Sequence, residues 1–176
     1  VATSSTDASA YGDLYQWGRG TDGHQIRTSS TTTTLSDSDT PGHANFIVSI
    51  SLPYDWRSPQ NNNLWLGMNG TNNPCPAGFR VPTDAEWDAE RISWTSNNAA
   101  GASASLLKLT LGGFRSGGGA LTSVGSGGYY WSSTISGTDS RDLAILSGTA
   151  SIDNTHRAYG FSVRCIENTK FEVISI

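Results

Sequence analysis

Alternating apolar and polar positions predict short strands near both ends of the chain. In residues 11–17 the odd positions carry the aromatic side chains Tyr11, Tyr15 and Trp17, and Leu14 stands at an even position. A period of two is typical of a strand with one buried face. We expect the aromatic face of this strand to be the buried one.

Further strands are predicted at residues 45–52, 129–136, 141–146 and 160–166, where short apolar runs are bounded by turn residues. Residues 18–44, in contrast, are almost devoid of apolar side chains and are expected to form a long loop. Loops of this length in compact domains are usually functional or are ordered by their own polar contacts. The pattern as a whole favours strands and ordered loops over helices.

One helix is clearly marked, at residues 83–93. Thr83 can cap its first turn, and Glu86 three residues later can return the hydrogen bond, which is the pattern of a capping box. Pro82 prevents the helix from beginning earlier. The stripe expected to pack on the domain consists of Ala85, Ala89 and Ile92, with Trp87 beside it.

The two ends of the chain differ from the middle in composition. We expect residues 1–10 to be a polar N-terminal arm, residues 11–168 a single domain, and residues 169–176 a strand-like tail. The tail has high β propensity and exposes apolar side chains on both faces if it is left unpaired. The side chains predicted to act as an assembly strand are Phe171, Val173, Ile174 and Ile176.

Composition narrows the class of protein. The chain has 176 residues, enough for one domain with a core, but only 36% are hydrophobic and 15% charged. Ser and Thr together make up 44 residues, and 17 aromatic residues argue against disorder. A net charge of −4 gives no basic surface for nucleic acid, and no run approaches the 18 apolar residues of a membrane span. Since the chain begins with Val1, we expect a leader to have been removed.

The only two cysteines, Cys75 and Cys165, are 90 residues apart. Two buried thiols in a reducing compartment remain one interpretation. The low lysine content and the Ser/Thr-rich composition favour a disulfide and an extracellular location. Two cysteines this far apart, without a CxxC motif, make a poor zinc site.

Four sequence blocks carry a family resemblance. NPCPAGFRVPTDAEW (73–87), GYYWSST (128–134) and GFSVRC (160–165) resemble, in order and spacing, the diagnostic blocks of the Fibrobacter succinogenes major paralogous domain family. YGDLYQWGR (11–19) resembles its opening block. The helix start is also similar to that of the formylglycine-generating enzyme superfamily.

The resemblance implies an α+β protein with a C-type-lectin-like fold: a small twisted antiparallel sheet, one or two helices and long ordered loops. It also implies a secreted or cell-surface bacterial protein. In some relatives of this fold the variable ligand-binding residues lie in the C-terminal part. A candidate ligand face here would consist of Tyr129, Arg141, Asn154, His156, Arg157 and Tyr159.

Candidate chemistry is sparse. Both cysteines lie in blocks that look structural, which leaves no thiol nucleophile, and His24, His43 and His156 show no metal-binding spacing and are expected in surface loops. We therefore expect no catalysis, no cofactor and no tightly bound transition metal. The sugar-binding tripeptides of calcium-dependent lectins are absent, which disfavours calcium-dependent sugar binding, although Asp37, Asp39 and nearby loop carbonyls could hold a calcium ion.

Asn69 begins a glycosylation sequon, Asn69-Gly70-Thr71, which also arises often by chance.

Two function classes remain open. The first is a non-enzymatic extracellular subunit that assembles head to tail with copies of itself into a surface filament, by addition of a terminal strand. The C-terminal segment 170–176 is the first choice for that strand and the arm 1–10 the second. The alternative is a displayed domain, such as an adhesin, that binds a glycan or another cell-surface ligand.

Overall fold

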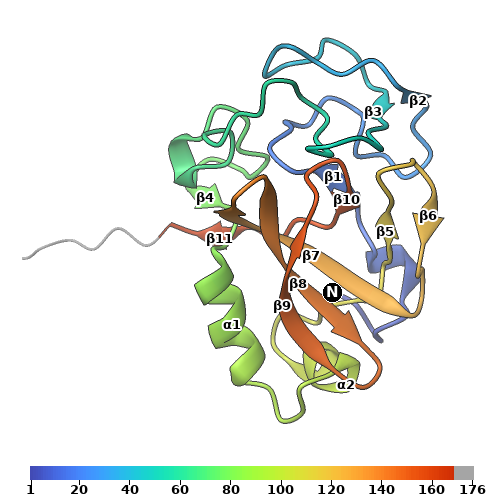
Figure 1. Ribbon diagram of the computed structural model, residues 1–176. Helices are drawn as coiled ribbons and strands as arrows, with labels where there is room; N and C mark the ends of the chain where they lie inside the picture. The colour runs from blue at the N-terminus through green and yellow to red at the C-terminus, as the bar shows by residue number, and fades with distance from the viewer. Residues whose placement is uncertain (169–176) are drawn as a thin grey trace, which may run out of the picture.

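The computed structural model describes residues 1–168, and the predicted assembly strand, with Phe171, Val173, Ile174 and Ile176, lies outside them. Within these residues the protein is a mixed α+β structure in which short strands predominate (Figure 1). Loops containing the early strands occupy one end of the molecule, and two helices and the longest strands occupy the other (Figure 1).

The main sheet is an antiparallel meander of three strands, ordered β7-β8-β9. These are β7 (Gly127–Ser136), β8 (Asp139–Leu146) and β9 (Ala150–Thr155). The register pairs Tyr130 with Leu143, and Leu143 with Ile152. The apolar segments predicted at 129–136 and 141–146 are therefore confirmed as strands.

The other strands are only two residues long. A four-stranded sheet of order β1-β10-β5-β6 contains β1 (Tyr15–Gln16), β5 (Phe114–Arg115), β6 (Leu121–Thr122) and β10 (Gly160–Phe161). Two two-stranded sheets complete the set: β2 (Thr31–Thr32) parallel to β3 (Phe46–Ile47), and β4 (Phe79–Arg80) antiparallel to β11 (Ile166–Glu167). Two 3-10 turns, η1 (Ala8–Ala10) and η2 (Gly67–Asn69), lie in the connecting loops.

Helix α1 (Asp84–Ile92) begins as predicted. Thr83 accepts from the main-chain N–H of Glu86, and the Glu86 side chain accepts from the N–H of Thr83, so the capping box is confirmed. A second helix, α2 (Ala99–Ala104), is capped by Asn98.

The predicted inner stripe of α1 is wrong. Ala85 and Ala89 are exposed and Ile92 is 68% exposed, whereas Trp87 is buried. The Trp87 indole packs 5.8 Å from the Tyr130 ring and donates a hydrogen bond of 3.0 Å to the Trp131 carbonyl. One large side chain thus fills the space between α1 and the sheet and turns the alanines toward solvent.

The aromatic face predicted for residues 11–17 is buried only at Trp17. Leu14 and Gln16 of the other face are also buried, while Tyr11 and Tyr15 are only half-buried. Only Tyr15–Gln16 forms a strand. The Gln16 side chain tolerates burial because its amide is paired with the main chain of Ile47: Nε2 donates to the Ile47 carbonyl, and Oε1 accepts from the Ile47 N–H.

The N-terminal arm lies against its own domain. The carbonyl of Ser5 accepts a 2.7 Å hydrogen bond from the N–H of Leu111, and Asp7 caps η1. The arm therefore already has a partner within the chain, which weakens it as the second choice for an assembly strand.

Two apolar clusters make up the interior. The first, on the loop side, contains four tryptophans, Trp17, Trp56, Trp65 and Trp131. The second lies between the helices and the sheet. It contains Trp87, Ala102, Leu109, Leu111, Tyr130, Leu143, Ile145 and Ala150.

Candidate binding groove beside the disulfide

Cys75 and Cys165 form a disulfide, with an S–S distance of 2.05 Å. It joins the loop before β4 to the residue before β11, and it confirms the predicted pairing. Structural disulfides are typical of proteins that fold in oxidising compartments.

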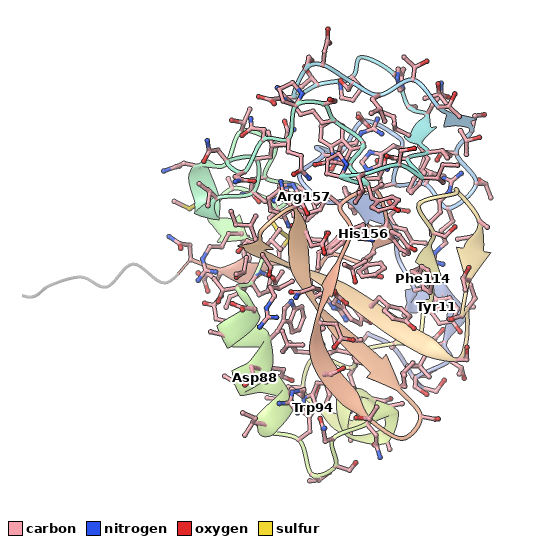
Figure 2. The ribbon with its side chains drawn as sticks, viewed as in Figure 1. Tyr11, Asp88, Trp94, Phe114, His156 and Arg157 are labelled. Carbon is pink, nitrogen blue, oxygen red and sulfur yellow. A yellow bond between two sulfur atoms is a disulfide. The ribbon has the colours of Figure 1, made fainter. Side chains whose placement is uncertain are left out.

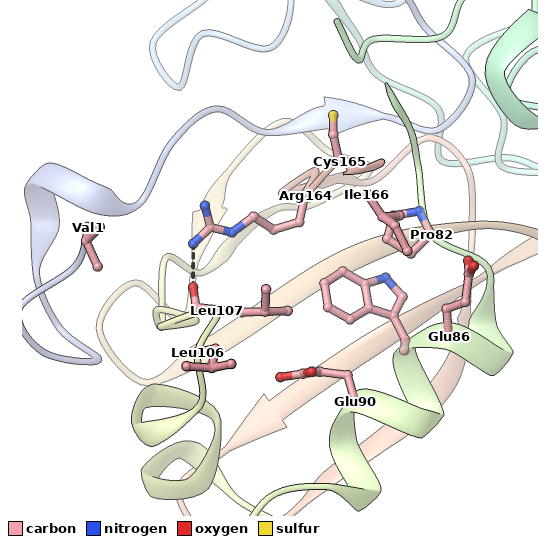
Figure 3. A pocket seen from close by; sticks show the side chains of 10 residues that line it. Val1, Pro82, Glu86, Glu90, Leu106, Leu107, Arg164, Cys165 and Ile166 are labelled. Atoms are coloured by element: carbon pink, nitrogen blue, oxygen red, sulfur yellow. Dashed lines mark hydrogen bonds between the residues drawn. The ribbon is translucent and has the colours of Figure 1, made fainter. Parts of the chain in front are cut away.

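A groove opens next to this disulfide, between α1, the loop that follows α2, and β11 (Figure 3). Its volume is about 620 Å³. The lining comes from four separate parts of the chain: Val1; Pro82, Glu86, Trp87 and Glu90; Leu106 and Leu107; and Arg164, Cys165 and Ile166.

The groove surface is mostly apolar. Trp87 is almost fully buried in its base, whereas Leu106 is 100% exposed and Leu107 40% exposed. A tight turn after α2 puts both leucines outside: the Ser105 hydroxyl accepts from the N–H of Leu107, and Lys108 adopts a positive φ of 50°. A large apolar side chain held wholly in solvent beside an apolar groove is typical of an interaction site.

Charged groups stand on the groove walls. On α1, the Glu86 carboxylate accepts a bidentate pair of hydrogen bonds from the Arg80 guanidinium, at 2.6 and 2.7 Å. These hydrogen bonds lower the pKa of Glu86 to about 2. Glu90 accepts a hydrogen bond from the Trp94 indole at 2.9 Å. Arg164 donates to the carbonyl of Leu107 at 2.9 Å (Figure 3). Among residues 1–168 neither Glu90 nor Arg164 has an ion-pair partner, so each is available to an incoming charge.

The predicted ligand face does not form one surface. Tyr129 pairs with Ala144, so it lies on the opposite side of the main sheet from Arg141 and its neighbour Asn154. Arg141 and Asn154 instead hydrogen-bond each other at 3.0 Å on the side of α1, where Arg141 also contacts a carboxylate of that helix.

Arg157 is fully buried and does not belong to any surface. Its guanidinium lies 4.6 Å from the centre of the Trp17 ring, with Asp55 at 3.9 Å. Inside the loop-rich end of the molecule, the Trp17 ring packs on the guanidinium and the Asp55 carboxylate lies close to its positive charge.

His156 and Tyr159 do lie together, in an aromatic row that the sequence did not indicate. His156 stacks on Tyr54 at 4.4 Å, and Tyr159 stacks on Phe114 at 5.8 Å. Figure 2 shows His156 and Phe114 on the same side of the molecule. The missing partners come from distant parts of the chain, Tyr54 from a loop and Phe114 from β5, and no local pattern marks them.

The remaining candidates are dispersed. Asn69 is exposed in η2. Asp39 is engaged by Arg57 at 2.8 Å, and no group of three or more His, Cys, Asp or Glu side chains in residues 1–168 is arranged to hold a metal ion.

His24 is buried rather than in a surface loop as expected. Burial lowers its pKa to about 4, and its Nε2 accepts from the N–H of Gln16.

No family model, no curated protein and no solved structure matches the chain. None of the helices in residues 1–168 is both long enough and apolar enough to cross a membrane.

Proposed function

We propose that the chain is a non-enzymatic extracellular structural subunit that assembles head to tail with copies of itself through the C-terminal segment 170–176. The observation that supports this most directly is the position of the apolar groove, whose lining includes Ile166, two residues before the end of the described domain. The apolar groove therefore lies next to the end of the described domain, where the chain continues into an apolar segment of high β propensity.

Residues 1–168 already provide two apolar clusters and the disulfide. Free in water, the segment would expose four large apolar side chains, each worth about 1.5–3 kcal/mol on burial. Pairing with another copy would bury them, and a head-to-tail contact whose rotation does not close into a ring propagates into a fibre.

The resemblance to the Fibrobacter succinogenes major paralogous domain family and the C-type-lectin-like fold are part of the same proposal. The mixed α+β architecture, the short strands and the long ordered loops are compatible with that fold. The disulfide supports an extracellular or cell-surface location.

Deletion of residues 170–176 tests the function. We expect the intact chain to form filaments visible by negative-stain microscopy and the shortened chain to remain monomeric. Filaments of normal length from the shortened chain would contradict the proposal.

A displayed glycan-binding domain is the second candidate, and the aromatic row favours it. Half-exposed rings such as His156 and Tyr159 offer flat apolar surfaces with polar edges, which suit sugar rings. Alanine at both positions should abolish binding in a glycan-array screen of the intact chain. If the intact chain binds no glycan, this second function is excluded.

A further inference from the structure

Strand β11 has an unpaired edge beside the groove. It pairs with β4 and with no other strand of residues 1–168, and Ile166 lines the groove. The main-chain N–H of Asn168 continues the ladder by donating to the carbonyl of Gly78 at 2.9 Å. A further strand could therefore add at the outer edge of β11 and lay its side chains into the groove.

We propose that this groove is the acceptor site, and that its occupant is segment 170–176 of a neighbouring copy of the chain. The inference rests on the proposed function and names the surface that completes it. The segment KFEVISI carries four large apolar side chains, and two of them, Ile174 and Ile176, share a strand face with Lys170 and Glu172. The groove offers Leu106, Leu107 and Ile166 to cover that face.

The charges of the segment complement those of the groove. Lys170 and Glu172 are two residues apart and so share one face of a strand. The groove carries Glu90 on α1 and Arg164 before β11, neither of them in an ion pair within the described part of the chain. Glu86 is already neutralised by Arg80, which leaves Glu90 as the partner for Lys170.

A neighbouring copy suits the groove better than the chain's own tail. Asn168 is held in the ladder by its N–H, and its side chain accepts from Arg80 at 3.1 Å. A tight hairpin back along β11 would then need Thr169 and Lys170 at its two turn positions. Tight hairpin turns need positive φ there, which favours Gly, Asn or Asp and disfavours a β-branched residue such as threonine.

The acceptor can be blocked without touching the core by Leu106→Glu, since Leu106 is fully exposed. Ile92→Glu is the matched control, because Ile92 is also an exposed apolar residue of this region but does not line the groove. We expect Leu106→Glu to raise the critical concentration for assembly about tenfold or more, and Ile92→Glu to leave it unchanged.

Mixing two defective chains tests the direction of the contact. The Leu106→Glu chain keeps its segment but lacks the acceptor, whereas the chain without residues 170–176 keeps the acceptor. At a concentration below the raised critical concentration of Leu106→Glu, each chain alone should sediment as a monomer, and the mixture should give a 1:1 complex that does not extend. As a second test, Glu90→Lys should weaken assembly, and Lys170→Glu in the same chain should restore it.

The outcomes separate the inference from the function on which it rests. Assembly by the chain that lacks residues 170–176 would overturn both. If that chain is monomeric but Leu106→Glu assembles like the intact protein, the function stands and the groove is not the acceptor. If the intact chain is a monomer and a synthetic TKFEVISI peptide binds only after residues 170–176 are removed, the occupant is the chain's own tail, and both proposals are wrong.

Discussion

The loop half of the molecule and the helix–sheet half are held together in different ways. In the helix–sheet half the main chain of β7, β8 and β9 is paired in a continuous ladder, and apolar side chains fill the space below α1. In the loop half the strands are two residues long, so most peptide groups have no ladder partner.

Buried polar side chains take over that role in the loop half. The Trp56 indole donates to the Trp17 carbonyl at 2.7 Å, and Asn72 donates to the Gly18 and Asp39 carbonyls at 2.8 and 2.7 Å. Buried peptide groups need hydrogen-bond partners wherever they lie. Side chains of distant segments can therefore order a loop region as a ladder orders a sheet.

The largest expected effect comes from removing the disulfide, which ties Cys75 of the loop half to Cys165. The double variant Cys75→Ser with Cys165→Ser should lower the free energy of unfolding by about 4–5 kcal/mol, because a loop of 90 residues is no longer closed in the unfolded chain. Urea denaturation measures this loss. Hydrogen exchange should show more lost protection in the loop half than in β7–β9, and equal loss in both would contradict the contrast between them.

The second prediction compares one residue from each half. Gln16→Leu keeps the volume but leaves the N–H and C=O of Ile47 and the C=O of Ala158 buried without this partner, at a cost of about 3 kcal/mol. Leu143→Ala, in the other core, should lower the free energy of unfolding by about 2–5 kcal/mol, because it leaves a cavity. If Gln16→Leu unfolds at the same urea concentration as the intact chain, buried polar contacts do not hold the loop half.

The same contrast explains what could be predicted from the sequence. The capping box of Thr83 and Glu86, strands β7 and β8 of the main sheet and the disulfide follow from short patterns or from a count of two cysteines. Strand β9 was not predicted. The burial of Gln16 does not, because its partners Ile47 and Ala158 lie 31 and 142 residues away. An alternating pattern assigns every polar residue to the outside, and distant hydrogen-bond partners that allow its burial leave no local signal.

The groove was missed for a related reason. The consecutive leucines Leu106 and Leu107 are visible in the sequence, but no local pattern marks them as exposed. Their exposure follows from the Ser105 turn and the positive φ of Lys108, and the groove needs α1 and β11 to complete it. The candidate ligand face failed because residues near in sequence alternate between the two sides of a sheet.

The third prediction concerns pH. Each half buries one titratable group, and as pH rises the two groups change the free energy of unfolding in opposite directions. His24 in the loop half has its pKa lowered to about 4 by burial, so its contribution to stability is lost as pH falls from about 6.5 toward 4. Asp142 in β8 has its pKa raised to about 7 by burial, so its contribution is lost as pH rises from about 4 toward 7.

Between pH 4 and 7 these two slopes oppose each other, and the intact chain should show little net change from them. Asp142→Asn should leave the His24 slope, so that the free energy of unfolding rises by about 3 kcal/mol from pH 4 to 7. His24→Asn should leave the opposite slope. Urea denaturation across this range measures both, and parallel slopes in the two variants would rule out the assignment.

The smallest expected effect lies where the halves meet. Glu86→Gln keeps a capping-box residue but removes the ion pair to Arg80, which joins α1 to β4. Because the Glu86 side chain is 34% exposed, solvent screens the pair, and we expect a loss of only about 1 kcal/mol at pH 7. The pKa of Glu86 lies near 2, below its unfolded value, so this contribution is present at neutral pH and lost as pH falls toward 2. The difference between Glu86→Gln and the intact chain should therefore shrink below about pH 4.5.

Asp88→Asn, which breaks the more exposed pair with Arg91 on the same helix, should change stability by less than about 0.5 kcal/mol. Equal effects of the two substitutions would mean that Glu86 acts only within its own helix and does not connect the two halves.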